Sequence, residues 1–256
     1  MDRKPVSQSL DDERPRPDSP DQPTYQNHLA RYEFALQWIQ PHHRVAETAC
    51  GTGYGAHLIA GKARSVLATD YSQLAIDYAR EHFQASNLEY RVMDCARFDM
   101  PLETFDSMIS FEVFEHLSDQ RRYLEDCARC LRAGGLLLLS TPNRVTADLH
   151  MSSIGQTNPF HIGLVDLKDF KQMLGLVFSR FQIYGQRRRG NWVYSTLRSL
   201  DVMNLRLRLL RPHRRESLQQ QFGVAAGARV NSREWVFTRL QLQQCNNFVA
   251  ACWKNS

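Results

Sequence analysis

Hydrophobic and polar positions follow two alternating patterns along residues 44–143. Short, mainly apolar runs predict buried β-strands, and apolar residues spaced three and four apart predict helices that cover a sheet. The sequence predicts strands at 44–49, 65–70, 88–93, 105–111 and 136–141, and helices at 54–60, 73–83 and 119–131. Because helices separate most of these strands, we expect a parallel, doubly wound α/β sheet.

The segments on either side extend this pattern. Helices are predicted at 26–39 and 167–174, and strands at 178–184 and 248–253. Pro41 is expected to end the first of these helices, because proline cannot continue a helical backbone. The last two predicted strands are separated by a long stretch of different composition, 187–234, which we interpret as an insertion or lid.

Composition narrows the class of protein. Of the 256 residues, 43% are hydrophobic, which is enough for a folded core. The chain has no apolar run of about 18 residues, and its first residues lack the apolar stretch of a signal peptide. Six cysteines are too few for a disulfide scaffold, so we expect a soluble, cytoplasmic protein.

Residues 1–24 differ from the rest of the chain. They contain five of the ten prolines, no aromatic residue and ten charged residues of both signs. Such a segment cannot bury enough apolar surface to offset the loss of conformational entropy. We therefore predict a disordered tail at 1–24, followed by a single domain at 25–256.

Positive charge is concentrated in the predicted insertion. Residues 187–216 hold nine arginines against Asp201 and Glu216, a net charge of +7 against +5 for the whole chain. Four interpretations remain open: binding of an anionic acceptor, binding of nucleic acid, contact with an acidic membrane surface, and a solvated basic face.

The most informative local motif is VAETACGTGYG at 45–55, where a predicted strand runs into a glycine turn and a helix. Gly51 and Gly53 allow close approach of a ligand, and the helix start offers unpaired N–H groups. Asp70 ends the next strand, nineteen residues after Gly51, which is the spacing of an acid that accepts hydrogen bonds from ribose. Asp94 ends the third strand and could accept from an exocyclic amine. The alternatives are a helix cap for Asp70 and a turn for Asp94.

Together these segments resemble the class I S-adenosylmethionine-dependent methyltransferases, of the broad small-molecule type. The resemblance runs from about Tyr25 to Trp253. Its motifs are HLARYEFA (28–35), VAETACGTGYG (45–55), Asp70, MDCARFDMP (93–101), FDSMISFEVFEHLSD (105–119), LRAGGLLLLSTPN (131–143) and NPFHIGLVDLKDF (158–170). The FEVFEHL segment is not expected in a NAD-binding fold.

The resemblance implies a seven-stranded, Rossmann-like, three-layer α/β/α fold. Its last strand, 248–253, would insert antiparallel between the fifth and sixth strands. Many family members have glycine where this chain has Ala49. Alanine disfavours positive φ, so we expect ordinary backbone angles at that residue.

The resemblance also implies site residues, with S-adenosyl-L-methionine as cofactor and S-adenosyl-L-homocysteine as product. Glu47 would lie near the methionine amino group, and Gly51 and Gly53 against the cofactor. Asp70 would hold the ribose, with Tyr71 beside the adenine. The remaining implied residues are Asp94 and the Cys95 backbone at the adenine edge, Phe111 and Glu112 by the methionine, and Arg31 and Tyr32 covering the site.

Methyl transfer requires an aligned acceptor, and an oxygen acceptor can also require a general base. His161, in NPFH, and His116, in EHL, are the candidates, because histidine titrates near neutral pH. A structural hydrogen bond is the alternative role for His116. No metal site is predicted, since Cys127 and Cys130 lie within a helix and nothing completes a set of four ligands.

We therefore expect a methyltransferase that acts on a hydroxyl, or less favourably an amine, of a small molecule, glycan or lipid-linked acceptor. Nucleic acid is disfavoured, because FEVFEH replaces the Pro-Pro-aromatic turn of enzymes that methylate base amines. Two alternatives are a non-catalytic cofactor-binding module that docks a partner through 187–234, and a NAD-dependent oxidoreductase.

Overall fold

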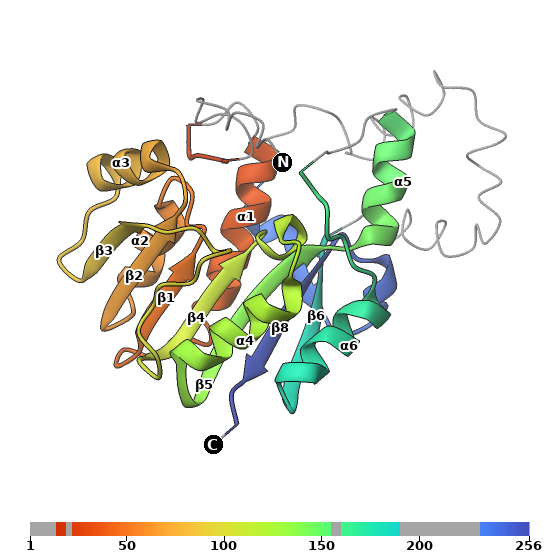
Figure 1. Ribbon diagram of the computed structural model, residues 1–256. Coiled ribbons are helices and arrows are strands. Elements are labelled where there is room, and N and C mark those ends of the chain that lie inside the picture. Colours follow the sequence, from red (N-terminus) through yellow and green to blue (C-terminus); the bar gives the residue numbers. More distant parts are fainter. Residues whose placement is uncertain (1–13, 19–21, 155–159, 190–230, 256) are drawn as a thin grey trace, which may run out of the picture.

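The computed structural model describes residues 14–18, 22–154, 160–189 and 231–255. Its centre is a sheet in the order β3-β2-β1-β4-β5-β8-β6-β7 (Figure 1). The strands are β1 Arg44–Thr48, β2 Ser65–Asp70, β3 Leu88–Val92, β4 Phe105–Phe111, β5 Leu131–Pro142, β6 Arg180–Arg188, β7 Trp235–Thr238 and β8 Asn247–Trp253. Strands β1 to β5 are parallel, which confirms the doubly wound α/β prediction.

The last strand lies where the resemblance implied. β8 pairs antiparallel with both β5 and β6. The expected count of seven strands is wrong, because β7 adds an eighth, antiparallel to β6 at the sheet edge. β7 has only four half-buried residues, too short a run to give a clear strand signal.

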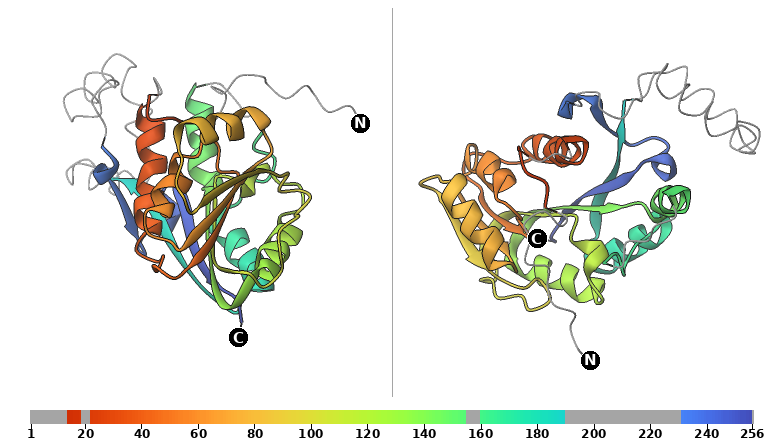
Figure 2. Two further views of the ribbon diagram at one scale, coloured as in Figure 1. Left: turned by 90° about the vertical axis from the view of Figure 1, so that its left-hand side faces the viewer. Right: turned by 90° about the horizontal axis from the view of Figure 1, so that it is seen from above.

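Helices cover both faces of the sheet and form the predicted three layers (Figure 2). One face carries α1 Gln22–Ala35, α2 Tyr54–Ala60 and α3 Gln73–His82, and the other carries α4 Gln120–Cys130 and α6 Leu167–Val177. Two buried clusters fill the spaces between the layers, one beneath α1 to α3 and one beneath α4 and α6. Among the described residues there are three short 3₁₀ helices: η1 Phe114–His116 after β4, η2 Ser232–Glu234 directly before β7, and η3 Leu242–Gln244 between β7 and β8.

Several predicted boundaries differ from the structure. α1 begins at Gln22, earlier than the expected start of order near Tyr25, and ends at Ala35, well before Pro41. α4 ends at Cys130, one residue before its predicted end, and β5 begins at Leu131, before the predicted 136, so that Gly134 and Gly135 lie inside the strand. There Gly134 has φ +73°, within a register shift between β4 and β5. No helix was predicted directly after β5, but the chain there forms α5 Arg144–Ile154, which stands at the carboxyl edge of the sheet (Figure 1).

Candidate functional site

The carboxyl ends of β1, β2 and β4 bring three acidic residues to one edge of the sheet. Glu47 is buried near the end of β1, Asp70 ends β2, and Glu112 directly follows β4. β1 lies between the other two strands, so the three side chains belong to neighbouring strand tips. This is the edge where open α/β sheets bind ligands.

The turn after β1 is built from left-handed backbone. Ala49, Gly51 and Gly53 have φ of 52°, 56° and 88°. The expectation of ordinary angles at Ala49 is therefore wrong. The Cys50 N–H donates to the Thr69 carbonyl at 2.8 Å, and this bond ties the turn to β2. The pairing of the turn with β2 thus holds Ala49 at a positive φ, although alanine prefers a negative φ.

Gly53 is required by packing as well as by its backbone. A Cβ at this position would lie 2.6 Å from Ala79 Cβ and 2.8 Å from the Tyr90 hydroxyl oxygen. Gly51 is different, because among the described residues a Cβ there would meet only Arg14 Cγ, at 3.8 Å. Gly51 therefore leaves space on the ligand side of the turn.

Asp70 holds this turn against β2. Its buried carboxylate accepts from Gly51 N through Oδ2 and from Ser72 N through Oδ1, each at 2.9 Å. The cap of α3 is Ser72, whose hydroxyl accepts from Ala75 N. The helix-cap alternative for Asp70 is therefore excluded.

Glu47 is buried with one oxygen bonded and one left over. The Tyr32 hydroxyl donates to Glu47 Oε1 at 2.5 Å, while Oε2 has no hydrogen-bond partner among the described residues. Burial, with a smaller effect of nearby Asp70, raises the pKa of Glu47 to about 7. A donor or cation placed beside Oε2 would favour its ionised form.

Glu112 joins four elements. Its Oε1 lies 3.0 Å from Arg31 Nη1 of α1 and accepts from the Ser140 hydroxyl of β5 at 2.7 Å. Its Oε2 accepts from Asn247 Nδ2 of β8 at 3.0 Å. Arg31 has no exposed surface, and its Nε and Nη2 find no hydrogen-bond partner in the described parts of the chain. The sequence did not predict Ser140 and Asn247 as site residues. The only sequence feature that marks them is that each is a polar residue in a mainly apolar strand.

The residues expected around the adenine are less enclosed. Tyr71 is 52% exposed. Asp94 Oδ1 accepts from Ala96 N at 2.8 Å, so Asp94 does form the turn that was its alternative role. Burial raises the pKa of the Cys95 thiol to about 12, so this cysteine is not a nucleophile at neutral pH.

Aromatic packing joins the leading helix to the strand tips. The Tyr32 ring packs edge-to-face on Phe111 at 5.3 Å and on Tyr54 at 5.5 Å between ring centroids. The structure thus places Tyr32 and Phe111 against one another, next to Glu47.

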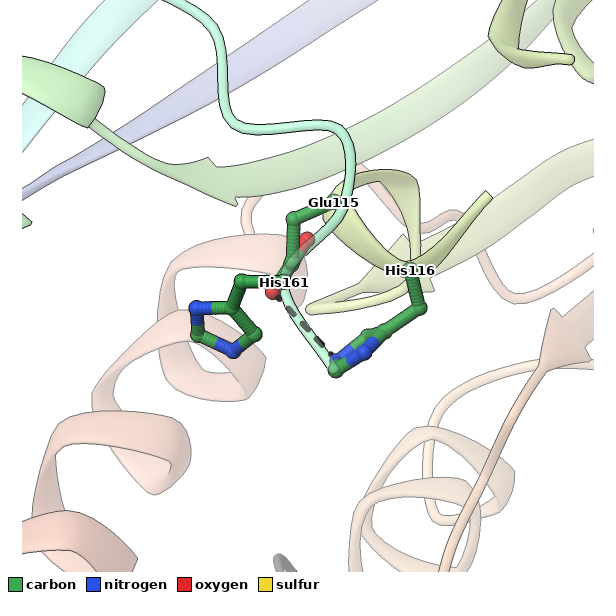
Figure 3. Close-up of side chains that lie close together, drawn as sticks. All are labelled: Glu115, His116 and His161. Atoms are coloured by element: carbon green, nitrogen blue, oxygen red, sulfur yellow. Dashed lines mark ion pairs between the residues drawn. The ribbon is translucent and has the colours of Figure 1, made fainter. Parts of the chain in front are cut away.

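The two candidate histidines come together beside Glu115 (Figure 3). His116 Nε2 lies 3.9 Å from Glu115 Oε1, and the His116 and His161 ring centroids are 5.0 Å apart. Glu115 is buried, and its Oε2 has no hydrogen-bond partner among the residues that the structure describes. The three residues offer ligand atoms within 4.8 Å of one another, so this group could also hold a metal ion.

The histidine loop is fixed to η1 by hydrogen bonds. Gln120 Nε2 donates to the Phe114 and Gly163 carbonyls, and Gly163 N donates to the Glu115 carbonyl at 2.8 Å. His116 Nδ1 lies 3.1 Å from the Phe160 carbonyl oxygen. His116 therefore makes the structural hydrogen bond that was its alternative role, and this bond orients its ring.

The other candidate features have structural roles where they are described. Cys127 and Cys130 are buried free thiols of α4 in the hydrophobic core. Of the arginine-rich stretch, Arg188 belongs to β6 and pairs with Glu234 at 2.7 Å. Residues 190–230 of the predicted insertion lie outside the described residues. No helix in the described part of the chain is long and apolar enough to cross a bilayer.

Comparison with known proteins finds similarity to methyltransferases. Residues 46–139 match the family described as a methyltransferase domain. A probable S-adenosylmethionine-dependent methyltransferase of Mycobacterium tuberculosis is 36% identical over 147 residues, which cover 56% of this chain and 52% of the relative. A ubiquinone biosynthesis O-methyltransferase of Rhizobium rhizogenes is 35% identical over 103 residues, 40% of this chain and 42% of the relative.

A solved structure shares the fold. A chain in the Haloferax volcanii complex of the Trm112 methyltransferase activator with a putative methyltransferase superposes with a TM-score of 0.63, at 13% identity, over 93% of this chain and 95% of that one. The chain spans about half the length of these Mycobacterium tuberculosis relatives. The matched domain, these relatives and the strand order together support a class I S-adenosylmethionine-dependent methyltransferase, a family that uses S-adenosylmethionine as its cofactor.

Proposed function

We propose that this chain transfers the methyl group of S-adenosylmethionine to a hydroxyl of a small-molecule, glycan or lipid-linked acceptor that carries negative charge. The observation that carries the proposal is a pair of incompletely bonded, oppositely charged groups, Glu47 near the end of β1 and Arg31 on α1. Glu47 Oε2 lacks a donor, and Arg31 Nε and Nη2 lack acceptors among the described residues. Buried polar atoms are costly without partners, so these groups fit a ligand that supplies both.

The amino-acid half of S-adenosylmethionine has this chemistry, with an ammonium group and a carboxylate. Glu47 would accept from the ammonium, and Arg31 would donate to the carboxylate. Phe111 and Glu112 would lie beside the methionine chain, with Tyr32 covering it.

The nucleoside half would lie along the glycine turn. Asp70 would accept from the ribose hydroxyls, Tyr71 would lie beside the adenine, and Asp94 with the Cys95 backbone would meet its edge. Gly51 and Gly53 would let the backbone approach the cofactor. When bound, the cofactor supplies a methyl group already activated by the sulfonium charge.

The residues of this chain would then position the acceptor, exclude water and accept a proton. Positioning of reactants can contribute about 7–11 kcal/mol to a rate enhancement. His161 and His116 are the proposed bases, since their rings lie 5.0 Å apart between centroids, beside buried Glu115. A relative that is a ubiquinone biosynthesis O-methyltransferase supports an oxygen acceptor.

The negative charge of the acceptor is inferred from the arginines at 187–216. Arg188 is already engaged by Glu234, so Arg187 and Arg189 are the arginines of this stretch to test within the described residues. Turnover of anionic acceptors should fall in Arg187→Gln/Arg189→Gln while that of neutral acceptors is retained. Equal kinetics for both acceptor classes would reject an anionic acceptor.

A transfer assay with S-adenosylmethionine labelled in its methyl group tests the proposal. The panel should contain matched hydroxyl and amine acceptors, each in neutral and anionic form. Label on hydroxyl acceptors is the expected result, and label confined to amines would reject O-methylation. Cofactor binding without transfer to any acceptor would favour the non-catalytic module that docks a partner through 187–234.

A further inference from the structure

A short N-terminal segment, residues 14–18, lies against the glycine turn, at the edge where α1 begins (Figure 1). The Thr52 hydroxyl donates to the Pro15 carbonyl at 3.3 Å. Arg14 Cγ lies 3.8 Å from the position that a Cβ on Gly51 would take. The segment therefore covers the side of the turn that a ligand would approach.

Arg14 uses the carboxylate that is proposed to bind the ribose. Its Nη2 lies 3.3 Å from Asp70 Oδ1, and the two side chains are only 13% and 3% exposed. A carboxylate oxygen accepts about two hydrogen bonds. Ser72 N also donates to Oδ1, so Arg14 fills the second acceptor site of Oδ1. Gly51 N already occupies one of the two acceptor sites of Oδ2. A ribose diol cannot form its full pair of bonds to Asp70 while Arg14 remains.

Arg14 also lies at the position proposed for the adenine. Its guanidinium carbon is 5.1 Å from the centroid of the Tyr71 ring, within the range of a cation–π contact. Further along, the Arg16 guanidinium carbon is 5.7 Å from the centroid of the Tyr78 ring on α3. One arginine thus contacts both groups that are expected to hold the nucleoside, and the next one contacts α3.

We propose that residues 14–17 form a built-in competitor of the cofactor, in which Arg14 occupies the nucleoside position and must leave before S-adenosylmethionine can bind. This inference rests on the proposed placement of the nucleoside at Asp70 and Tyr71. It adds a regulatory function to a segment that the sequence alone assigned to a disordered tail.

The chain connectivity makes such competition effective although each contact is weak. Three residues separate Asp18 from the start of α1, so the segment stays close to the site. A tethered group of this kind acts at an effective concentration in the millimolar range. Pro15 and Pro17 also restrict the unbound segment, which lowers the entropy lost when it docks.

The test compares full-length wild type with Arg14→Gln, which removes the charge but retains a polar side chain. Arg64→Gln is the matched control, because Arg64 is an exposed arginine at the opposite, amino-terminal edge of the sheet. S-adenosylhomocysteine and adenosine are each titrated into the three proteins. We expect Arg14→Gln to bind both ligands about three- to tenfold more tightly, and Arg64→Gln to stay within about twofold of wild type.

The equal gain for the two ligands is diagnostic, because the segment contacts only the nucleoside half of the site. Affinity that is unchanged or weaker in Arg14→Gln overturns the competitor and leaves the proposed function intact. A gain for S-adenosylhomocysteine but not for adenosine also overturns it. If none of the three proteins binds either ligand, the proposed function itself fails and the inference fails with it.

Discussion

Arg31 on α1 and Glu112 after β4 form an ion pair of 3.0 Å, in which the guanidinium is completely buried. Glu112 reaches this position with φ +56°, a backbone conformation that non-glycine residues rarely adopt. Bonds from Ser140 and Asn247 hold its carboxylate, so three strands and the leading helix fix one charged group at the site. Such strain persists where the surrounding structure determines it, and it concentrates at functional sites.

Glu112→Gln should lower the free energy of unfolding by about 3–5 kcal/mol, because it leaves the buried Arg31 without its counter-charge. Urea denaturation measures the change. Glu125→Gln is the control, since Glu125 forms an exposed pair with Arg121 on α4 and its loss should cost less than about 1 kcal/mol. Similar losses in the two variants would show that the Arg31–Glu112 pair is not an energetic anchor of the site.

Substitution of Gly53 and of Gly134, which both have positive φ, distinguishes the cost of packing from the cost of backbone strain. Gly53→Ala should destabilise the protein by more than about 2 kcal/mol, because the new Cβ meets Ala79 and Tyr90 in addition to the unfavourable φ. Gly134→Ala has the same strain but no neighbour within 4 Å, so about 1 kcal/mol is expected. Thermal and urea unfolding measure both losses of stability. Equal losses in Gly53→Ala and Gly134→Ala would contradict a packing role for Gly53.

Glu47 should make stability depend on pH. The pKa of Glu47 in the folded protein is about 7, against 4.5 for an ordinary glutamate, so between these values the folded state binds more protons than the unfolded state. Stability therefore falls as pH rises from about 4.5 to 7, by roughly 2–4 kcal/mol for this group.

Glu47→Gln removes this dependence and keeps an acceptor for Tyr32. The difference in unfolding free energy between Glu47→Gln and wild type should grow in favour of the variant over that pH range. Glu89→Gln, at an exposed position of β3, is the control. Parallel pH profiles for wild type and Glu47→Gln would contradict a raised pKa.

His161→Asn should lower kcat by about 10²–10⁴ with any hydroxyl acceptor that the panel identifies, because a general base contributes that much. The affinity for S-adenosylhomocysteine should stay within about twofold, and a pH profile of kcat should lose its acidic limb. His116→Asn is measured in parallel, since its Nδ1 contact with Phe160 gives it a positioning role as well. Unchanged turnover in both variants would remove the histidines from the mechanism.

Much of the fold follows from local pattern. Strands β1, β2 and β4 lie where periodicity predicted them, because strands buried between two helical layers are mainly apolar on both faces. β5 was predicted to start at 136 but begins at Leu131. Asp70 was also predicted from its distance to Gly51, since a strand–turn–helix unit brings those two positions together.

Other parts of the site depend on contacts that local pattern does not contain. Ser140 and Asn247 are 28 and 135 residues from Glu112, and only the sheet order brings them to it. The left-handed backbone at Ala49 arises from the bond between Cys50 and β2, against the preference of alanine itself. Arg14 is 56 residues from Asp70 in the sequence, and it belongs to a segment whose composition is typical of disordered tails.

We propose that Asp70 binds the nucleoside of S-adenosylmethionine at the strand tips. Titration calorimetry of S-adenosylhomocysteine and of NAD with full-length wild type and Asp70→Ala tests it most directly. We predict that only S-adenosylhomocysteine binds wild type, and that Asp70→Ala weakens it by about tenfold to a hundredfold, the loss of a charge-assisted hydrogen bond. Equal affinity of wild type and Asp70→Ala for S-adenosylhomocysteine, or binding of NAD in its place, would contradict the account.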